Sequence, residues 1–336
     1  MFQTIILASV VALATSTNIH PREFYEKEFY DHVSTFKLKF TNGVEFIKRL
    51  SIFIENFDMI EKHNSDMSQT YKLGTNQFAH LTFAEFVDAV KINGTIPNLK
   101  KNPHGLIHEE PKDMSQVATS VDWTLKGAVT DVKDQGSCGS CWSFSATGSL
   151  EGAYYLKYGS LQAFSEQQLV SCDTVDAGCN GGWMDDAFTF AQKNGGLATE
   201  QAYPYTSGTS GKNGVCQTAG IVNNANVAPK SFTDVRTGSV NALMSAVSQQ
   251  PVSIAIQANQ PAFQFYTSGV LTGNCGKRLD HGVLLVGYGT DAATGVDYWN
   301  VKNSWSSTWG ESGFIRIERS TADKCGILDA PSYPNL

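Results

Sequence analysis

The cysteine at position 141 stands in surroundings that would make its thiol reactive. It lies in the run QGSCGSCWSFS, from Gln135 to Ser145. The residues before it are poor helix formers, whereas apolar residues after it recur at helical spacing, so we expect a helix to begin near Cys141. Unpaired N–H groups and the macrodipole at a helix start favour a thiolate over a thiol. Cys141 is therefore the candidate nucleophile for attack on a carbonyl carbon, and the Gln135 side-chain amide, beside the Cys141 backbone N–H, is a candidate donor to the developing oxyanion.

A thiol nucleophile needs a base, and the histidines leave one candidate. The seven histidines stand at positions 20, 32, 63, 80, 104, 108 and 281, so only His281 follows Cys141. If residues 1 to about 116 are removed on maturation, no other imidazole remains to take the thiol proton or to protonate a leaving amine. Asn303, in VKNSW, is the expected third member, because its amide oxygen can accept from the imidazole N–H and fix the tautomer of the ring.

Three short segments around these residues resemble the papain family of cysteine proteases, on its cathepsin L-like side. They are CGSCW at 138–142, DHG at 280–282 and NSW at 303–305, with the His and the Asn 140 and 162 residues beyond the Cys. The resemblance covers residues 20 to 336 and implies an α+β, papain-like fold of two lobes. A helical lobe would carry Cys141, an antiparallel β-barrel-like lobe would carry His281 and Asn303, and the active-site cleft would lie between them. Trp305 would shield the His281–Asn303 hydrogen bond from water, and Ser306 departs from the Gly that the family usually has after NSW.

The secondary-structure signals after Cys141 also segregate into two parts. Ser165 to Gln168 predicts a capping box that opens a short helix, and Trp183 to Lys193 predicts another helix, which stops at NGG. Beyond about residue 225 the chain is mostly strand, as in PVSIAIQA, GVLLVGYG, DYWNVKN and GFIRIER. A cleft between a helical part and a β-rich part is a common place for a binding site.

The N-terminal part predicts a secreted precursor. An apolar run from Ile5 to Leu13, followed by small residues, is too short to span a bilayer and resembles a signal peptide, although no Lys or Arg precedes it. We expect a signal peptide at 1–16, an inhibitory propeptide of the I29 type at 17–116 and a papain-like peptidase domain at 117–336. This organisation implies the secretory pathway, with a lysosome, a digestive vacuole or the extracellular space as destination. Asn93, in NGT, is the glycosylation candidate.

A stripe of residues on one predicted long helix resembles a propeptide signature. The residue types reproduce the papain-family motif known by the letters ERFNIN: Glu45, Arg49, Phe53, Asn56, Ile60 and Asn64. Gly74, Asn76 and Phe78 resemble the second motif, GxNxFxD, whose final Asp is His80 here.

The propeptide motifs imply an autoinhibited zymogen. Its helices would pack beside the cleft, and residues around 92 to 112 would run through the cleft backwards relative to a substrate. We expect acid to loosen this segment through loss of carboxylate interactions, or through His80 if that ring charges near pH 6. Cleavage near Ser115 to Thr119 would then release the enzyme.

The cysteines beyond the nucleophile predict disulfides. All seven cysteines lie between positions 138 and 325, so six remain beside Cys141. Six cysteines allow fifteen connectivities, and the sequence alone does not choose among them. The family resemblance implies the pairs Cys138–Cys179, Cys172–Cys216 and Cys275–Cys325. Such bridges require an oxidising route.

Substrate-binding residues follow from the same resemblance. Gly181 and Gly182 match a loop that pairs with an extended peptide backbone, for which a plain turn is the alternative, and glycine permits that close approach. The pocket for the residue two before the scissile bond (P2) would be lined by Trp183, Met184, Ala255, Leu279 and Gly282, with Ala330 at its base, and Trp305 would also contact substrate. Since the pocket residues are apolar or small, we expect Leu, Phe or Val at P2, and an Arg there would be buried without a partner. Asp329, one residue from Ala330, would change this preference if its side chain faced the pocket.

Other function classes explain fewer of these features. A CxxC redox pair or a zinc site at Cys138 and Cys141 would need a short βαβ domain or a second close cysteine pair, and the sequence has neither. An exopeptidase of the same family, a non-proteolytic binding homologue, and an amidase or transglutaminase remain alternatives, but no second histidine follows residue 117 and this favours an endopeptidase.

Charge and composition narrow the expected partners. From residue 117 the chain has 13 Lys and Arg against 18 Asp and Glu, a net charge of −5, with no basic patch to suggest nucleic acid. We expect no metal and no other cofactor, and no membrane segment in the mature form. The expected protein is a monomer whose partners are peptide and protein substrates, its own propeptide and cystatin-type inhibitors.

Overall fold

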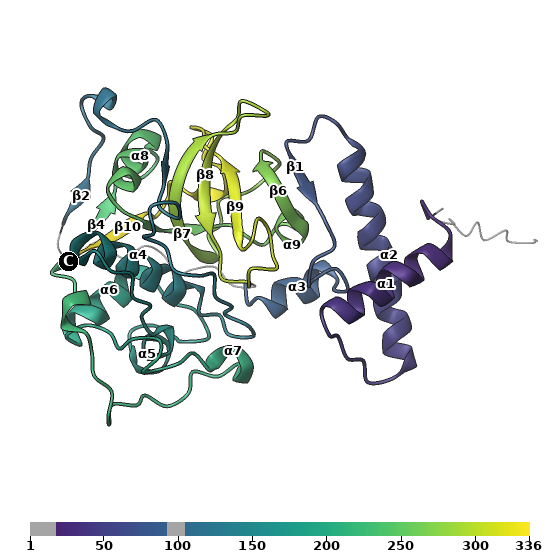
Figure 1. Ribbon diagram of the computed structural model, residues 1–336, viewed down its shortest axis with the longest axis horizontal. Coiled ribbons are helices and arrows are strands. Elements are labelled where there is room, and N and C mark those ends of the chain that lie inside the picture. Colours follow the sequence, from purple (N-terminus) through teal and green to yellow (C-terminus); the bar gives the residue numbers. More distant parts are fainter. Residues whose placement is uncertain (1–17, 93–104) are drawn as a thin grey trace, which may run out of the picture.

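The N-terminal part of the chain forms helices that stand beside a larger body (Figure 1). The computed structural model describes residues 18–92 and 105–336, so the expected signal peptide and the sequon at Asn93 lie outside the described residues. The N-terminal helices are α1 (Arg22–Thr35), α2 (Gly43–Ser65) and α3 (Phe83–Ala89). Asn42 caps α2, and Thr82 caps α3 in a full capping box with Glu85.

The larger body begins with helices and continues mainly with strands. Its helices are α4 (Cys141–Tyr158), α5 (Glu166–Cys172), α6 (Met184–Lys193), α7 (Ser207–Ser210), α8 (Val240–Gln249) and α9 (Pro261–Phe265), with short 3-10 turns η1 (Met114–Gln116), η2 (Ala225–Val227) and η3 (Lys324–Gly326). Helix α4 begins at Cys141, as the sequence predicted, and ends before Gly159, which has the left-handed φ of 72° that suits glycine. The region after residue 225 is mostly strand, interrupted by α8 and α9.

A ten-stranded sheet runs through the described residues. Its strands are β1 (Tyr71–Leu73), β2 (Ile107–His108), β3 (Val121–Asp122), β4 (Ser231–Val235), β5 (Val252–Ile256), β6 (Tyr266–Leu271), β7 (His281–Thr290), β8 (Asp297–Lys302), β9 (Phe314–Glu318) and β10 (Ser332–Asn335). Their order is β1-β6-β9-β8-β7-β5-β10-β4-β2, with β3 paired to β7. Neighbours are antiparallel except β6–β9 and β2–β4. The outermost strands, β1 and β2, both belong to the N-terminal segment, so that segment extends the sheet at both ends.

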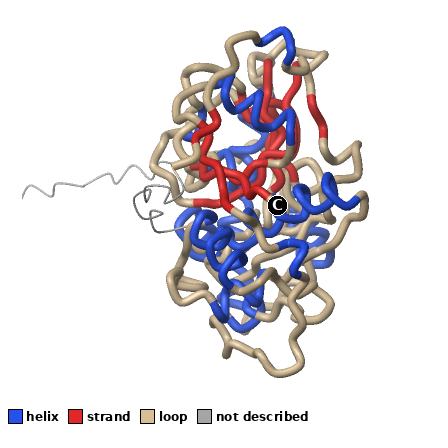
Figure 2. Tube along the Cα trace, turned by 90° about the vertical axis from the view of Figure 1, so that its left-hand side faces the viewer, coloured by secondary structure: helices blue, strands red, loops and turns tan. Residues whose placement is uncertain are grey.

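Two hydrophobic cores support two lobes. One core lies along the sheet and includes Leu285 and Val301, and the other joins α4 to α6 and includes Trp142 and Phe188. Figure 2 shows most strands in one half of the molecule, and helices joined by long loops in the other half. The sheet-side core continues into the N-terminal helices through buried side chains such as Phe53, so these helices are packed onto the body.

Helix α4 packs tightly across β7, and this packing sets the helix start next to the strand start. The Ser145 hydroxyl donates to the Val283 carbonyl at 2.7 Å. Gly148 lies so close to β7 that an added Cβ would stand 2.7 Å from Leu284 Cδ2, a separation that real Cβ atoms do not tolerate. The two lobes therefore meet along α4 and β7.

One local prediction was half wrong. The Ser165 hydroxyl accepts from the Gln168 N–H at 3.0 Å and caps α5 as expected. The Gln168 side chain does not return to Ser165, because it accepts from Ala198 N and donates to Asn223. The Ser165 N–H instead donates to the Ala198 carbonyl, so this is a simple cap and not a capping box. In the part of the chain that the structure describes, no helix is long and apolar enough to cross a membrane.

Candidate active site

Cys141 is the first residue of α4 and the free cysteine of the described chain. The other six form Cys138–Cys179, Cys172–Cys216 and Cys275–Cys325, the pairing that the family resemblance implied. The backbone N–H of Gly282 donates to the Cys141 sulfur at 3.3 Å. The sulfur is buried, with the side chain 6% exposed, so it is a thiol enclosed by protein and not a surface group.

His281 and Asn303 lie side by side because they flank paired strands. His281 begins β7 and Asn303 follows β8, and these strands are antiparallel neighbours. The imidazole Nε2 lies 2.7 Å from the Asn303 side-chain oxygen. Since an amide oxygen only accepts, Nε2 carries the hydrogen, and Nδ1 is the basic nitrogen of the ring. This Nδ1 is buried and has no hydrogen-bond partner among the described residues, so it is available for the thiol proton.

Trp305 covers this pair. Its ring stacks on the His281 ring with centroids 4.7 Å apart and planes 25° apart. The next residue, Ser306, has a φ of 69°, in the left-handed region that favours glycine. The backbone here is therefore the one that a Gly adopts without strain, and Ser306 adopts it with strain.

Burial favours the neutral forms of both the thiol and the imidazole in this closed site. Burial raises the pKa of the Cys141 thiol to about 11, although the Gly282 and Trp142 N–H groups oppose the shift. Burial also lowers the pKa of His281 to about 4, against the effect of its bond to Asn303. The expectation that the helix start would favour a thiolate is thus not met in this state, because loss of water outweighs the helix terminus.

Gln135 is held so that its amide nitrogen faces the N-terminal segment. Its side-chain oxygen accepts from the Ser304 hydroxyl at 2.7 Å, and its backbone N–H donates to the Ser304 carbonyl at 2.9 Å. The amide nitrogen donates to the Cys138 carbonyl at 3.1 Å and to the Val90 carbonyl at 3.3 Å. A backbone carbonyl of the N-terminal segment therefore occupies the donor that an oxyanion would need.

Side chains around α3 close the site from the same side. Gln77 donates to the Trp305 carbonyl at 2.8 Å, and the Phe86 ring meets the Trp305 ring edge-on at 5.5 Å. Val90 and Ile92 are buried at 4% and 0% exposure. These contacts hold the N-terminal segment against Trp305, the residue that covers His281.

The motif residues on α2 hold this covering segment in place. Asn56 donates to the carbonyls of Ala79 and Leu81 at 2.8 and 3.0 Å, and Asn64 both donates to and accepts from Leu73. On α2, Glu45 also accepts from Thr41, Arg49 donates to Glu85, and Phe53 and Ile60 are buried.

The residues of the second motif contact the peptidase domain. Asn76 donates to the Gln264 carbonyl, and Phe78 packs on Phe86 and Trp305. Gly74 would clash with Thr267 if it carried a Cβ.

His80, which replaces the motif Asp, lies against a second histidine. Its Nδ1 is 3.4 Å from Nε2 of His32 on α1. Burial, with a smaller contribution from Arg49, lowers the pKa of His80 to about 4, and burial together with His80 lowers the pKa of His32 to about 4. The prediction that His80 charges near pH 6 is therefore wrong for the folded segment, because the ring is desolvated beside a second imidazole.

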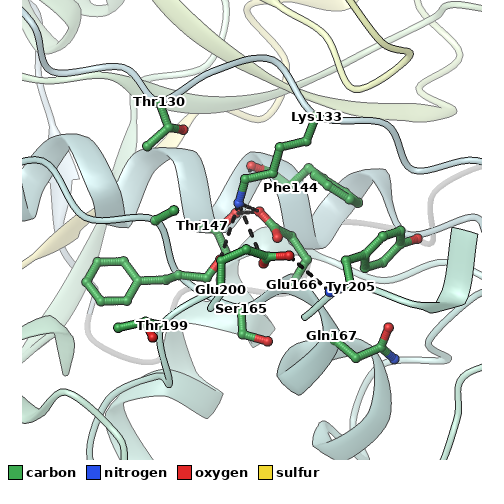
Figure 3. A network of polar contacts seen from close by, with 12 residues as sticks. Thr130, Lys133, Phe144, Thr147, Ser165, Glu166, Gln167, Thr199, Glu200 and Tyr205 are labelled. Carbon is green, nitrogen blue, oxygen red and sulfur yellow. Dashed lines mark hydrogen bonds and ion pairs between the residues drawn. The ribbon is translucent and has the colours of Figure 1, made fainter. Parts of the chain in front are cut away.

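A buried polar network that sequence reasoning missed links the lobes behind the site. The Lys133 amine lies 2.6 Å from a Glu166 oxygen (Figure 3). It also lies 3.5 Å from a Glu151 oxygen. The Thr130 hydroxyl donates to Glu151 at 2.6 Å and accepts from Lys302 at 3.0 Å. Lys302 precedes Asn303, so the network fixes the strand end that carries Asn303. Lys and Glu residues usually lie on a solvated surface, so their residue types did not predict a buried network here.

The expected P2 residues belong to one apolar cluster. Trp183, Met184, Ala255 and Ala330 are buried members of the helix-side core, and Leu279 packs against it. Gly282 adjoins them, since an added Cβ would lie 3.2 Å from the Met184 sulfur. Burial and the neighbouring Asp323 raise the pKa of Asp329. A Cβ added to Gly326 would lie 3.2 Å from the Asp329 carboxylate and 2.8 Å from Leu279, so this carboxylate lies at the Leu279 edge of the cluster.

Two different constraints favour glycine at the two glycine positions of the expected substrate loop. Gly181 has a φ of 106°, which side chains rarely adopt. Gly182 lies against the Trp142 ring, where an added Cβ would approach to 2.6 Å. The Trp183 N–H donates to Asp176 at 2.8 Å, and this bond fixes the end of the loop.

Comparison with known proteins agrees with this arrangement. Residues 117–335 match the papain family cysteine protease domain, and residues 29–86 match the cathepsin propeptide inhibitor domain (I29). Cathepsin L of Sarcophaga peregrina is 41% identical over 347 residues, covering 99% of this chain and 100% of the relative. The senescence-specific cysteine protease SAG39 of Oryza sativa subsp. indica is 44% identical over 300 residues, which cover 88% of this chain and 86% of the relative.

Solved precursor structures share the fold. Digestive procathepsin L 3 from the larval midgut of Tenebrio molitor superposes with a TM-score of 0.80 at 38% identity and covers 93% of this chain and 99% of its own. The recombinant stem bromelain precursor gives a TM-score of 0.81 at 38% identity, and the match covers 93% of this chain and 99% of the bromelain precursor. With the thiol, the imidazole–amide pair and the covering N-terminal helices in place, the chain belongs to the papain family of cysteine proteases and carries the inhibitor domain of the cathepsin propeptides.

Proposed function

We propose that Cys141, His281, Asn303 and Gln135 perform the peptide-bond cleavage of this cysteine endopeptidase. His281 Nδ1 takes the thiol proton, and the sulfur attacks the substrate carbonyl carbon. Gln135 and the Cys141 backbone N–H stabilise the oxyanion, and the imidazolium protonates the leaving amine. Water then attacks the acyl-enzyme, with His281 as base, and restores the thiol.

The observation that carries this proposal is the contact between the Val90 carbonyl and the Gln135 amide. A peptide carbonyl bound at that donor is the geometry that a substrate needs, yet here it belongs to the inhibitor domain. Autoinhibition follows from the same contact, because the segment holds the donor while burial keeps Cys141 and His281 neutral. Removal of the segment readmits water and lets the helix start and the His281 ring stabilise a thiolate–imidazolium pair.

Maturation is proposed to remove residues 1–16 as a signal peptide and then residues up to about 116. Support comes from η1 at Met114–Gln116, which is exposed and short, between the inhibitor domain and the peptidase domain. The three disulfides and the signal-like start support passage through the secretory pathway, with a lysosome, a digestive vacuole or the extracellular space as destination. Cystatin-type inhibitors and a monomeric mature state belong to the same proposal, as does glycosylation at Asn93.

The substrate preference is proposed to be an apolar P2 residue. The apolar cluster of Met184, Ala255 and Ala330, with Leu279 beside it, would receive Leu, Phe or Val, and an Arg there would be desolvated without a counter-charge.

Activated enzyme assayed on fluorogenic peptides with Leu or Arg at P2 tests this preference. We expect the Leu peptide to have the higher kcat/KM. Ala330→Glu should raise the Arg-to-Leu ratio of kcat/KM about ten-fold, because it places a carboxylate at the pocket base. Asp329→Ala is the matched control and should leave the ratio unchanged. A ratio that responds to Asp329→Ala and not to Ala330→Glu would contradict the pocket assignment.

A further inference from the structure

Residues 106–110 of the N-terminal segment lie on the peptidase domain at the end of the sheet opposite β1. Figure 1 shows β2 beside β4 there. Strand β2 pairs in parallel with β4, with Ile107 opposite Asp234 and His108 opposite Val235. The Arg236 N–H donates to the His108 carbonyl at 3.0 Å. This is strand addition to a sheet edge, a mode by which proteins bind extended peptides.

The His108 side chain lies between two hydroxyl groups of the peptidase domain. Its Nδ1 lies 2.9 Å from the Tyr333 hydroxyl of β10, and its Nε2 lies 3.0 Å from the Ser245 hydroxyl of α8. Both ring nitrogens are thus matched by hydroxyl groups, which can donate or accept as required. An imidazole satisfied on both nitrogens is recognised more specifically than an apolar side chain of the same size.

Two carboxylates extend the contact. Glu109 forms an ion pair with Arg236 at 2.6 Å. The Glu110 oxygens accept from Asn241 at 2.6 Å and from Ser239 at 3.0 Å, and these bonds lower the pKa of the Glu110 carboxyl. The edge of the peptidase domain therefore matches an extended sequence with a histidine followed by two acids, whereas the Ile107 side chain is exposed.

We propose that the outer edge of β4, with the hydroxyls of Tyr333 and Ser245 and the side chains of Arg236, Ser239 and Asn241, is a second docking site that retains the N-terminal segment after the chain is cut. This inference rests on the proposed cleavage near residues 115–119, which lies beyond the docked residues. The excised segment then stays bound at two sheet ends, through β1 on β6 and through β2 on β4. Two linked contacts dissociate more slowly than either one, because release of one leaves its partner at high effective concentration.

The retention is tested on the full precursor with Cys141→Ala and an engineered site for a specific protease at residues 113–117. After the cut, the release of a fluorescently labelled N-terminal segment is followed at neutral pH. Tyr333→Phe with Ser245→Ala should speed release about ten-fold, since two hydrogen bonds to a half-buried ring are lost. Tyr158→Phe with Ser160→Ala, at the exposed end of α4, is the matched control and should leave the rate unchanged.

A second set of variants leaves the peptidase domain untouched. His108→Ala should speed release to a similar extent, and Glu110→Gln about three-fold, because its acceptor bonds are solvent-exposed. Equal release rates for the native chain, for Tyr333→Phe with Ser245→Ala and for His108→Ala would overturn the proposal. A control pair that speeds release as much as the edge variant would overturn it as well. Because the added protease makes the cut, the result does not depend on the proposed catalytic residues, and failure of self-processing would be seen separately in the native precursor.

Discussion

Replacing His80 by asparagine should flatten the acid response of the inhibitor domain. His80 and His32 approach to 3.4 Å, and burial is the main cause that lowers both pKa values to about 4. Histidine in an unfolded chain has a pKa of about 6.5. Between these pH values the unfolded segment binds more protons than the folded one, so its stability is complete above pH 6.5 and falls as the pH drops towards 4.

The magnitude follows from the same numbers. The difference between 6.5 and about 4 corresponds to about 3.4 kcal/mol for one ring. Because the His80 ring is only partly buried, we reduce this to about 2 kcal/mol. Glu85, which also faces the pair, stays ionised in this window, since the Thr82 N–H, Arg49 and Lys48 outweigh burial and lower its pKa to about 2. His80→Asn keeps a polar side chain but cannot take up the proton, so about 2 kcal/mol of the acid response should disappear.

Hydrogen exchange of α2 and α3 amides in the Cys141→Ala precursor measures the response directly. The opening free energy of the native segment should fall by about 2 to 4 kcal/mol between pH 7 and pH 4. Between pH 7 and pH 4, the opening free energy of the His80→Asn segment should fall by about 2 kcal/mol less than that of the native segment. Ser34→Asn, on the exposed side of α1, is the control and should follow the native curve. An unchanged pH dependence in His80→Asn would refute the reasoning.

Three further variants follow from named contacts. Asn56→Leu leaves two backbone carbonyls without donors and should lower the stability of the inhibitor domain by about 2 kcal/mol in urea unfolding, so an unchanged midpoint would contradict the role of the bonds. Ser306→Gly relieves a left-handed φ and should raise thermal stability by up to about 1 kcal/mol with an unchanged kcat/KM, whereas a loss of stability would argue against strain at this residue. Thr130→Val breaks the link between Lys302 and Glu151 and should cost about 1 to 3 kcal/mol of domain stability by calorimetry, and a neutral result would mean that the network is not cooperative.

Residue types and spacing in the sequence predicted much of the fold and of the site. The short segments around Cys141, His281 and Asn303 resemble a known family, and the helix start at Cys141 follows from local propensity. Helical spacing also placed the motif residues of α2 on one face, where Asn56 and Asn64 bind the covering segment.

The features that the sequence did not predict depend on tertiary contacts. The Val90 carbonyl that meets Gln135 is a backbone group, and backbone groups carry no residue-type signal. Strands β1 and β2 have three and two residues, too short for an alternating pattern. The raised pKa of Cys141 comes from burial in the folded precursor, which outweighs a helix terminus that the sequence did predict.

Active-site labelling tests the central claim most directly. A thiol-reactive peptide probe with Leu at P2 is added to the precursor at neutral pH, and again after acid has released the N-terminal segment, and the labelled residue is located by mass spectrometry. We predict no labelling of the intact precursor and one equivalent on Cys141 after release, since the other cysteines are in disulfides. Equal labelling of Cys141 before and after release, or no labelling after it, would contradict the account of a thiol that the inhibitor domain keeps buried and neutral.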